Sequence, residues 1–576
     1  MNSAPSPVLQ LRLPLWRSRM MLAIVFAGFA TLMVRAVYLQ VVNTDFLQQK
    51  GQSRYSRVIE VGAHRGKITD RNGEILASST PVKSIWAIPD DVKATPAHLR
   101  DLARALEMPL ADLERKLAGT DREFVYLKRQ LSPDQAERVT QLGLAGIFQQ
   151  REYRRYYPAG EVAAHVLGFT GMDQTGQEGI ELAFQSDLAG NAGSRRVIKD
   201  RRGNVIEDVD AVRPPRDGRD LALSIDSKIQ YLAFRELKAA VEANRAKAGA
   251  IVVLDIHTGE VLALANLPVY NPNNRANLTG AQLRNRVLTD TFEPGSTMKP
   301  FTIALALELG MVKPATVVQT APGKLSIGRS TISDAHPHGA LTVAEVLQKS
   351  SNVGTVKLAL AIDRQVMGEM LNRAGFGVVP RVQFPGAVAG KVRPAATWRP
   401  IEQATMSYGY GLSASLLQLA RAYTIFARDG DIVETTFLKT SGAAFGTPVV
   451  HPEVAQAVRK MLEAAAGPGG TAPRAQTMGY RVAGKTGTAH KQEGDGYAEK
   501  KYRASFVGFA PVSSPRLVVA VMIDEPAAGR YFGGDVAAPV FSAVVGGALR
   551  ILGVAPDAPM RPIVLPPEGA EVRESI

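Results

Sequence analysis

The chain has 576 residues, enough for two or more domains and a large core. Its 45% hydrophobic and 21% charged residues are ordinary for a globular protein, and the lack of cysteine excludes disulfides, a thiol nucleophile and thiolate metal sites. The net charge of +14 is dispersed and not interleaved with aromatic residues, which argues against nucleic-acid binding. It suits a surface facing anionic lipid or another anionic polymer, and equally a plainly solvated surface.

The first long apolar segment, residues 20–42, is long enough to span a bilayer. Residues 1–19 carry three arginines and no acidic residue, which predicts a cytoplasmic tail and an extracytoplasmic position for the rest of the chain. Arg35 is costly in hydrocarbon unless it reaches the outer head groups. A cleaved signal peptide is the alternative, but no convincing small-residue cleavage site follows the apolar run. We therefore expect an uncleaved transmembrane helix.

Residues 43–220 have the pattern of a mixed, elongated module. The sequence Asp70-Arg71-Asn72-Gly73 between alternating apolar flanks predicts a hairpin turn with positive φ at both central residues. Thr95 to Leu117 and Ser132 to Leu142 have the spacing of amphipathic helices. The tyrosines at 153, 156 and 157 are expected to form a packed aromatic cluster. We expect a pedestal that sets height and partner contacts, with no chemistry of its own.

Residues 221–555 alternate short apolar strands with helical segments. The expected strands are Ile251–Leu254 and Val261–Leu264, joined by a hairpin at His257-Thr-Gly259, and later Tyr480–Ala483, Ser505–Phe509 and Leu517–Ile523. This order fits an antiparallel sheet covered by helices on both faces. From Pro556 the chain is proline-rich and ends in acidic residues, which predicts a flexible tail over 556–576.

The segment 291–300 places Ser296 and Lys299 three residues apart at the start of an apolar helix. A proline and a glycine break the preceding chain, and Phe301 to Leu309 runs almost wholly apolar up to the next glycine. Residues three apart share a helix face, so the Lys299 amine can reach the Ser296 hydroxyl as the base that a serine nucleophile requires. Alone, the pair is weak evidence, because a helix cap and a solvated lysine explain it as well.

Two further segments complete a three-part pattern. Lys349-Ser350-Ser351-Asn352 supplies Ser-x-Asn, and Lys485-Thr486-Gly487-Thr488 supplies Lys-Thr-Gly. Their order and wide spacing match the signature of penicillin-binding proteins and serine β-lactamases. Three matches in the right order are hard to produce by chance, so the chain is similar to these serine acyl-transfer enzymes.

The resemblance covers the chain between its two tails. Class B penicillin-binding proteins carry pedestal signatures similar to Arg65–Ala77 and to Gly179-Ile-Glu181 with Leu188-Ala-Gly190. Their division-specific FtsI-type branch resembles this chain at Asn271-Pro-Asn273, Tyr408-Gly-Tyr-Gly411 and Tyr531-Phe-Gly-Gly534. No glutamate-bearing glycosyltransferase signature appears, which argues against the bifunctional class A. The resemblance implies an α/β (α+β) fold: a transmembrane helix, a dimerisation-type pedestal over 43–220 and a transpeptidase domain over 221–555.

The residue types suggest a role for each motif member. Ser296 attacks a carbonyl and becomes acylated, with Lys299 as base, and burial together with the cation Lys485 would favour a neutral amine. The Ser350 hydroxyl can relay a proton between the leaving amine and the lysines. Asn352 offers a donor and an acceptor, suited to holding a substrate amide and Lys299 together.

Residues 485–488 have the pattern of a strand edge, to which an extended peptide can add by backbone hydrogen bonds. The Lys485 cation with the Thr486 and Thr488 hydroxyls can bind a carboxylate, and Gly487 would let the substrate backbone lie close. The resemblance implies an oxyanion hole from the backbone N–H groups of Ser296 and Thr488. It also implies a donor peptide ending in D-Ala-D-Ala, an acceptor amine on a neighbouring stem peptide, and acylation of Ser296 by β-lactams.

No metal or other cofactor is expected, because the eight histidines show no ligand spacing except His336-Pro-His338 in a polar loop. The resemblance implies a bacterial inner-membrane protein with its catalytic domain outside the cytoplasm, acting at the septum. It also implies a multi-span SEDS-family glycan polymerase and other division proteins as partners.

Three alternatives share the motifs. A β-lactamase would need a water-activating base, and no Glu-x-x-Leu-Asn pattern is present. A β-lactam sensor usually has several spans and an intracellular effector, whereas about nineteen residues precede the span here. Elongation-specific class B enzymes usually read Ser-x-Asp where this chain has Ser350-Ser-Asn352, so this position favours a division role.

Overall fold

The structure is a computed structural model that describes residues 14–42, 56–118, 124–199, 205–494, 496–561 and 563. Its first element is α1 (Leu15–Val37), which continues as a π-helical turn η2 (Tyr38–Val42). Within Leu15–Gln40, an 18-residue window has a mean hydropathy of 2.1 and none of its residues is buried, as expected of a membrane span or a signal sequence. The helix begins five residues before the predicted apolar segment and includes Arg17 and Arg19.

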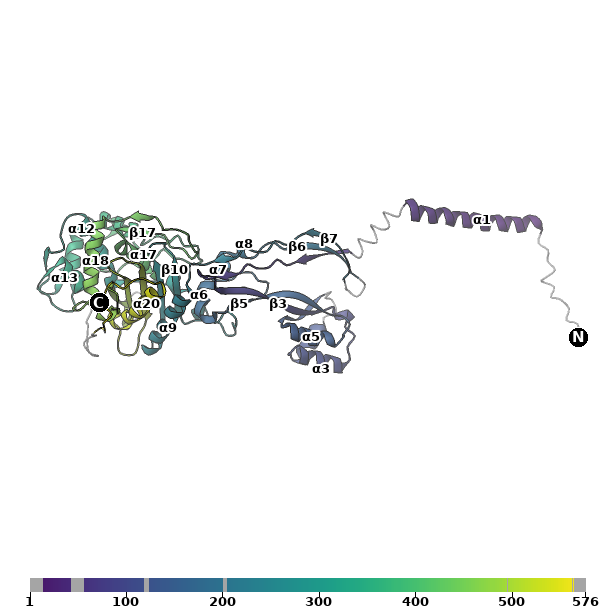
Figure 1. Cartoon of the computed structure of the whole chain (residues 1–576), viewed down its shortest axis with the longest axis horizontal. Coiled ribbons are helices and arrows are strands. Elements are labelled where there is room, and N and C mark those ends of the chain that lie inside the picture. The colour runs from purple at the N-terminus through teal and green to yellow at the C-terminus, as the bar shows by residue number, and fades with distance from the viewer. Residues whose placement is uncertain are drawn as a thin grey trace.

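The pedestal, residues 56–220, consists of two long arms that run side by side toward the compact C-terminal domain (Figure 1). Its elements are β1 (Ser56–Val61), β2 (Ile68–Thr69), β3 (Ile75–Ala87), α3 (Pro96–Ala105), α4 (Leu110–Leu117), β4 (Val125–Leu131), α5 (Pro133–Gln141), β5 (Ile147–Tyr156), α6 (Ala164–Leu167), α7 (Gly179–Ala183), α8 (Gln185–Leu188), β6 (Gly193–Lys199) and β7 (Val205–Arg213). One arm is the sheet β1-β6-β7, and the other is built on β3, which pairs with β2, β4 and β5. Helices α3, α4 and α5 form a lobe on the second arm with a small core of its own.

The hairpin predicted at residues 70–73 is present, but its turn differs from the expected type. Gly73 has φ of +91°, whereas Asn72 keeps a negative φ. The Asp70 carboxylate accepts hydrogen bonds from the N–H groups of Asn72 and Glu74, both at 2.8 Å. This side-chain cap holds the turn without a second left-handed residue, which the Asn-Gly pattern alone does not reveal.

The helix predictions in the lobe are partly right. Ser132 caps α5 in a capping box, so this helix lies where the pattern put it. The segment 95–117 forms two helices instead of one, because Glu107 takes φ of +50° and Pro109 follows it. The proline also has no N–H to continue the first helix.

The predicted tyrosine cluster does not form. Tyr153 packs against His64 at a ring distance of 4.4 Å, Tyr156 is 50% exposed, and Tyr157 is buried with its hydroxyl accepting from Thr170 N. Residues 153 and 156 lie on opposite faces of β5, since side chains alternate along a strand, and residue 157 lies beyond its end.

Charged contacts hold the pedestal together and fix it to the next domain. Arg65 and Arg155 both pair with the fully buried Glu181, at 2.6 and 2.7 Å. Arg65 and Glu181 belong to the two predicted pedestal signatures, so the signatures meet in one buried ion triad that Arg155 of β5 completes. Arg71 in the hairpin turn pairs with Glu260 of the C-terminal domain at 3.1 Å, which joins the two parts.

The C-terminal domain is built on a five-stranded antiparallel sheet in the order β10-β9-β21-β20-β19. The strands are β9 (Ala248–Asp255), β10 (Val261–Leu267), β19 (Ala483–Glu493), β20 (Gly496–Ala510) and β21 (Leu517–Asp524). The hairpin predicted at 257–259 joins β9 to β10, and the strands predicted at 505–509 and 517–523 lie in β20 and β21. Tyr480–Ala483 is wrong as a strand, because β19 begins only at its last residue and runs through the Lys-Thr-Gly segment.

Helices cover both faces of this sheet, as predicted. The long helices are α9 (Ser227–Ala243), α12 (Lys299–Glu308), α17 (Leu416–Ala427), α18 (Pro452–Ala466) and α20 (Ala538–Ile551). In β9, Ala250, Val252 and Leu254 face the core that holds α12 and α17, whereas Ile251 and Val253 face the core that holds α9 and α20. Burial on both faces explains why the strand is apolar throughout and does not alternate.

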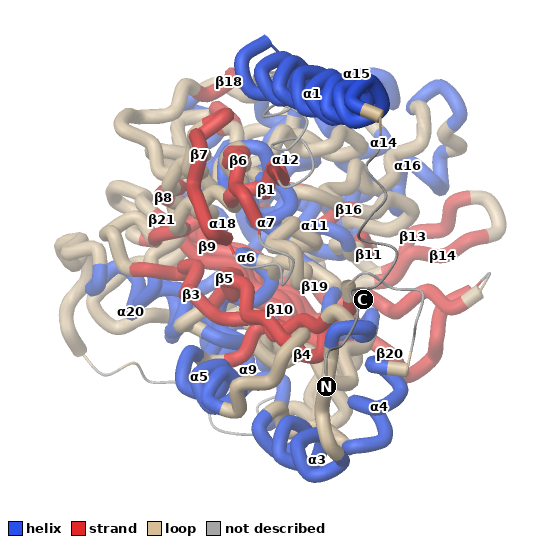
Figure 2. The backbone as a smooth tube through the Cα atoms, turned by 90° about the vertical axis from the view of Figure 1, so that its right-hand side faces the viewer, coloured by secondary structure: helices blue, strands red, loops and turns tan. Residues whose placement is uncertain are grey.

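Smaller elements surround the sheet. They are β8 (Leu221–Ala222), α10 (Gly280–Leu283), α11 (Arg286–Thr289), β11 (Thr291–Phe292), η5 (Gly295–Met298), β12 (Val317–Gln319), β13 (Lys324–Ile327), β14 (Ser330–Ser333), β15 (Ala340–Thr342), α13 (Val343–Gln348), α14 (Asn352–Leu360), α15 (Arg364–Arg373), α16 (Pro400–Ser407), β16 (Ala414–Ser415), β17 (Asp431–Val433), β18 (Gly446–Pro448) and α19 (Gly533–Val536). The β13–β14 hairpin protrudes at the edge of the domain (Figure 2).

Residues at both ends of the predicted C-terminal domain contact neighbouring segments. Strand β8 at residues 221–222 pairs in parallel with β2 of the pedestal. At the other end, Asp557 accepts from the N–H groups of Arg481 and Ser513, at 2.7 and 3.1 Å. The start of the predicted flexible tail is therefore packed on the domain, and most of the remaining tail lies outside the described residues.

Candidate active site

The predicted nucleophile lies in a tight turn at the N-terminal end of the buried helix α12. Ser296 belongs to the 3₁₀ turn η5, and the α-helix itself begins at Lys299 with Pro300 in its first turn. Gly295 has φ of +58° and donates its N–H to Gly409 O at 3.2 Å. A Cβ on Gly409 would lie only 2.1 Å from Gly295 O, so this glycine is required for the two loops to meet.

The lysine of the first motif and the serine of the second are in direct contact. Lys299 is fully buried, and its Nζ donates to Ser350 Oγ at 3.0 Å and to Ser350 O at 2.5 Å. Ser350 has φ of +57°, which is uncommon for a residue with a side chain. This conformation turns both its carbonyl and its hydroxyl toward Lys299, and the contact compensates for the strain.

Asn352 lies at the start of α14, and only 2% of its surface is exposed. Its Nδ2 donates to Ser333 O at 3.1 Å on the β13–β14 hairpin, while its Oδ1 is buried and has no hydrogen-bond partner in the described part of the chain. A contact between Asn352 and Lys299 stays a prediction, and the hydrogen bonds given for the Lys299 amine are with Ser350. The unpaired Oδ1 is an acceptor for an amide N–H.

A carboxylate that sequence reasoning missed supports the second motif. Asp334, just after β14, accepts from Ser351 Oγ at 2.7 Å and from Val353 N at 3.0 Å. Ser351 in turn caps α14 through Gly354 N at 2.9 Å. Nothing in the spacing of Asp334 indicates this contact, because the hairpin brings it to the motif from 17 residues away.

The Lys-Thr-Gly segment forms part of β19, the edge strand of the sheet, as predicted. Lys485 is fully buried and its Nζ donates to Thr486 Oγ1 at 3.1 Å, Thr486 O at 3.3 Å and Thr471 Oγ1 at 3.5 Å. Thr471 Oγ1 also lies 2.9 Å from Thr486 Oγ1. Thr471 comes from the loop after α18 and was not predicted, because no motif contains it.

The structure shows a packing role for Gly487, in addition to the predicted role in substrate binding. A Cβ at this position would lie 2.6 Å from Pro294 O and 2.6 Å from Ser505 Oγ. The glycine therefore lets the nucleophile turn pack against β19, whereas the prediction assigned it to the approach of a substrate. A Cβ on Gly295 would lie 3.7 Å from Thr488 N, so the two predicted oxyanion residues, Ser296 and Thr488, lie on neighbouring segments.

Two of the segments that resemble the FtsI-type branch, residues 531–534 and 271–273, contact the structure around the motifs. Gly533 N donates to Thr488 Oγ1 at 3.0 Å, and Tyr531 stacks on Tyr502 of β20 with ring centroids 4.2 Å apart. Asn273 exchanges two hydrogen bonds with the backbone of Tyr157, at 2.8 and 3.0 Å, and so ties the pedestal to the C-terminal domain. The three motifs thus meet at one place, between the edge of the sheet and the start of α12.

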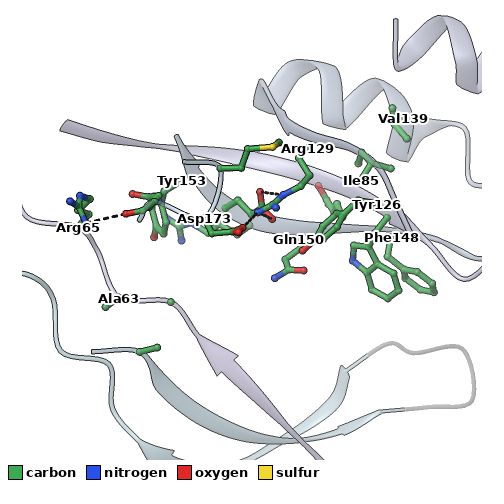
Figure 3. Close-up of a pocket in the computed structure, with 18 of the residues that line it drawn as sticks. Ala63, Arg65, Ile85, Tyr126, Arg129, Val139, Phe148, Gln150, Tyr153 and Asp173 are labelled. Carbon is green, nitrogen blue, oxygen red and sulfur yellow. Dashed lines mark hydrogen bonds and ion pairs between the residues drawn. The ribbon is translucent and has the colours of Figure 1, made fainter. Parts of the chain in front are cut away.

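An opening lies in the pedestal, away from these residues. It is a cleft of about 1310 Å³ between the two arms, with Tyr126, Phe148 and Arg129 on its wall (Figure 3). Arg129 pairs with Glu152 and Asp173, at 3.1 and 2.8 Å. No motif residue lines this cleft, so its volume does not mark the site of the chemistry.

Comparisons with known proteins agree with the two-part architecture. The family model described as Penicillin binding protein transpeptidase domain matches residues 249–546, and the Penicillin-binding Protein dimerisation domain matches residues 60–223. A solved structure titled as the apo TP domain of Burkholderia pseudomallei penicillin-binding protein 3 is 54% identical with a TM-score of 0.55, and covers 58% of this chain and 98% of that one.

Curated relatives match almost the full chain. The probable peptidoglycan D,D-transpeptidase PenA of Neisseria meningitidis is 44% identical over 545 residues, which are 94% of this chain and 93% of that protein. The peptidoglycan D,D-transpeptidase FtsI of Escherichia coli K12 is 42% identical over 549 residues, 94% of this chain and 93% of the relative. With both family models and both domains in order, this chain belongs to the class B penicillin-binding proteins, among the peptidoglycan D,D-transpeptidases of the FtsI and PenA type.

Proposed function

We propose that this protein is the septal D,D-transpeptidase of its cell and that it cross-links stem peptides through an acyl-enzyme on Ser296. The contact between Lys299 Nζ and the Ser350 hydroxyl supports this most, because it joins a buried amine to a proton relay at the foot of the nucleophile turn. Lys299 is one helical turn from Ser296, within reach of its hydroxyl.

In the acylation step, Ser296 Oγ attacks the carbonyl carbon of the penultimate D-alanine. The Oγ–C bond forms, the peptide C–N bond breaks, and the proton of Oγ reaches the leaving D-alanine amine through Lys299 and Ser350. Negative charge on the carbonyl oxygen is stabilised by the N–H groups of Ser296 and Thr488, and one such donor contributes about 3–4 kcal/mol. The neighbouring positions of their two segments support this pairing.

The donor peptide lies along the free edge of β19 by added backbone hydrogen bonds. Its terminal carboxylate meets Lys485, Thr486 and Thr488, and the hydroxyl of Thr471 belongs to the same polar group. The unpaired Oδ1 of Asn352 accepts the N–H of the donor amide, which explains why this oxygen has no partner among the described residues.

In the second step, a neutral amine of the acceptor stem peptide attacks the acyl carbon. The new C–N bond forms, the C–Oγ bond breaks, and one amine proton returns to Ser296 Oγ. The enzyme is regenerated and the two stem peptides are joined by an amide. β-Lactams imitate the donor and stop at the first step, because the opened ring stays in place and deacylation is slow.

Mass spectrometry of the full-length protein with benzylpenicillin tests the nucleophile. One covalent adduct per chain is expected, carried by Ser296 and absent from Ser296→Ala. The matched control is Ser326→Ala, a serine exposed on β13, which should be acylated like the wild type. Folded wild-type protein without an adduct would reject the proposal, and rapid turnover of penicillin would assign it to the β-lactamases instead.

The division role, the partners and the location form the finer part of the proposal. Asn352 in place of the aspartate of elongation enzymes supports septation, and the relative from Escherichia coli carries the name FtsI. Helix α1 would anchor the chain with its N-terminus in the cytoplasm, and the pedestal would carry the catalytic domain outward toward a SEDS-family polymerase and other division proteins. Depletion in the native bacterium should give smooth filaments without septa, whereas rounded cells would indicate elongation.

A further inference from the structure

One face of the sheet in the pedestal lobe is packed, and the opposite face carries a row of aromatic rings. Ile85 and Leu127 belong to the small core that this sheet shares with α3, α4 and α5. Because side chains alternate along a strand, Trp86 points to the other side of the same sheet. It lies directly opposite Tyr126 of β4 and Phe148 of β5. The three rings therefore form one row across neighbouring strands, on the face turned away from the helices.

These rings contact one another and remain partly open to solvent. Trp86 stacks on Phe148 with ring centroids 4.5 Å apart, and Phe124 lies 4.9 Å from Trp86 and 4.7 Å from Tyr126. Phe124 is 42% exposed, and the other three rings are half-buried. Mutual packing fixes the positions of the rings, but it does not explain why so much aromatic surface is left uncovered. A contiguous exposed surface of this kind is typical of an interaction site.

The row of rings forms one wall of the cleft between the two arms. Phe148 and Gln150 extend from β5 into the space that separates this arm from the other (Figure 3). On the opposite arm, the residues that line the cleft include Gly62, Ala63 and Ala192, whose small side chains leave the ring wall accessible. The volume of about 1310 Å³ exceeds that of an ordinary small-molecule pocket and is open enough for a segment of a polymer.

Polar side chains without partners follow the rings along β5. Strand β5 pairs with β3 alone, so its other edge is free where it borders the cleft. Gln149, Gln150 and Arg151 are exposed there, and their side chains make no hydrogen bond with any other residue that the structure describes. Arg129 differs from them, because Glu152 holds it at 3.1 Å. The two amides each offer a donor and an acceptor, and Arg151 offers donors with a positive charge.

Aromatic rings beside side-chain amides are the combination that binds a carbohydrate. One face of a pyranose presents C–H groups that pack on an aromatic ring, while its hydroxyl and acetamido groups need donors and acceptors around the rim. The carboxylates of the stem peptides on the same polymer suit the guanidinium of Arg151. An extended peptide added to β5 would use backbone groups and apolar side chains, and it would give the amides no role.

We propose that the cleft between the pedestal arms binds a glycan strand of the polymer substrate. The sugars lie on the rings of Trp86 and Phe148, and their polar groups meet Gln150 and Arg151. This inference rests on the proposed transpeptidase function and names a second contact for the substrate of that reaction. The site binds and takes no part in bond formation.

The position of the cleft determines what this binding does. From Ile75, beside the turn that contacts the catalytic domain, to Trp86, β3 advances about 36 Å at the rise of an extended chain. The bound sugars are therefore remote from Ser296, and other stem peptides of the same strand reach the nucleophile. Holding the polymer at one place raises the effective concentration of its stem peptides at the site, because their encounter with Ser296 becomes intramolecular. Free stem peptides gain nothing from the cleft.

The first measurement is binding without catalysis. Full-length protein in detergent is titrated with soluble peptidoglycan glycan strands from which an amidase has removed the stem peptides, and the anisotropy of a fluorophore on the strand reports binding. Trp86→Ala should weaken the affinity about 10-fold and Gln150→Ala about 3-fold. Gln150 is exposed, so its variant keeps the fold. Phe445→Ala is the matched control, because it removes a 99% exposed ring from the catalytic domain and should bind as the wild type does.

The second measurement separates polymer from free peptide in the reaction itself. The donor is a peptide thioester, and the acceptor is either uncross-linked glycan strands that carry stem peptides or the free stem peptide. Trp86→Ala should raise the apparent KM for the strands about 10-fold, and it should leave the KM for the free peptide and the rate of benzylpenicillin acylation unchanged. A general loss of stability would change all three quantities together.

The outcomes distinguish this site from the proposed function. Equal glycan affinity in the wild type, Trp86→Ala and Gln150→Ala would overturn the proposal, and failure of Trp86→Ala to support division would then assign the rings to a protein partner. Displacement of the glycan strands by free stem peptide would overturn the recognition of sugars. A wild type that binds the strands but is not acylated by benzylpenicillin would reject the transpeptidase function and support the glycan site.

Discussion

The pedestal and the transpeptidase domain both bury cationic side chains, but they surround them differently. Arg65 and Arg155 in the pedestal share the carboxylate of Glu181 at 2.6 and 2.7 Å. The contacts resolved for Lys299 and Lys485 in the site are with hydroxyl and carbonyl oxygens. A permanently charged guanidinium needs a counter-charge in the interior, whereas an amine among neutral oxygens can give up its proton without stranding an anion.

The comparison shows how similar sequence features serve two purposes. In the pedestal, the ion triad fixes one arrangement of the chain, and each member depends on the others. In the site, two amines are buried to the same degree among neutral oxygens, an environment that proton transfer and carboxylate binding would require. Replacing a buried cation should therefore affect stability in one region and chemistry in the other, and the predictions below test this difference.

The largest effect is expected at the base. Lys299→Met keeps the length and burial of the side chain but removes the amine, so acylation by benzylpenicillin should slow by about 10³- to 10⁴-fold while the unfolding temperature changes little. Stopped-flow acylation and thermal unfolding of the same protein measure both quantities. Lys349→Met, at the exposed lysine beside Ser350, is the matched control and should acylate normally. A large loss of stability with retained acylation would show that Lys299 serves the stability of the domain and not its chemistry.

The pedestal should respond in the opposite sense. Glu181→Gln leaves two buried guanidinium groups without a counter-charge, at a cost of about 3–5 kcal/mol in the free energy of unfolding. Thermal unfolding should fall accordingly, while protein that is still folded at low temperature keeps its acylation by penicillin. Glu161→Gln, in an exposed pair with Lys238 at 3.2 Å, should cost less than about 1 kcal/mol. Equal effects of the two variants would show that the triad does not hold the pedestal.

A third prediction concerns the contact between the nucleophile turn and the edge strand. Gly487→Ala introduces a Cβ at 2.6 Å from Pro294 O, so the turn must shift, at a cost of about 1–3 kcal/mol. Because the turn carries Ser296, acylation should slow together with the loss of stability. Gly496→Ala, where an added Cβ has open space, is the control. Normal acylation in Gly487→Ala would show that the turn and β19 do not need this close approach.

The structure brings the predicted motif residues together, whereas it corrects several predictions in the pedestal, and the difference has a physical reason. Ser296, Lys299, Ser350 and Lys485 belong to short motifs whose residue types are dictated by chemistry, and each motif lies at the end or edge of one element. The split of the 95–117 helix depends instead on Glu107 adopting a left-handed conformation, which no residue type signals there. The tyrosines at 153, 156 and 157 are close in sequence, but the alternation of side chains along β5 places 153 and 156 on opposite faces.

Contacts made across the fold were beyond the reach of the sequence. Asp334 reaches Ser351 from a hairpin, Thr471 reaches Lys485 from a loop, and neither lies in a motif. The packing role of Gly487 was missed because the approach of Pro294 is visible only in three dimensions. Glu293 lies inside the segment 291–300, but its hydrogen bonds with Gly411 N and the Tyr497 hydroxyl come from residues 118 and 204 positions away.

The smallest expected effect is also at Glu293, and it depends on pH. Burial raises its pKa in the folded state above the ordinary value of 4.5, so between these two values the folded protein binds more protons than the unfolded chain. Its contribution to stability is therefore fully present at acidic pH, below the unfolded value, and is lost as pH rises through the folded value. Glu293→Gln should raise the unfolding temperature at pH 7 and leave it nearly unchanged near pH 4, measured by thermal unfolding at both values. The same gain at both pH values would mean that ionisation of Glu293 does not lower the stability of the folded protein. A gain confined to pH 7 would show that the domain carries an ionised, partly buried carboxylate at the expense of stability.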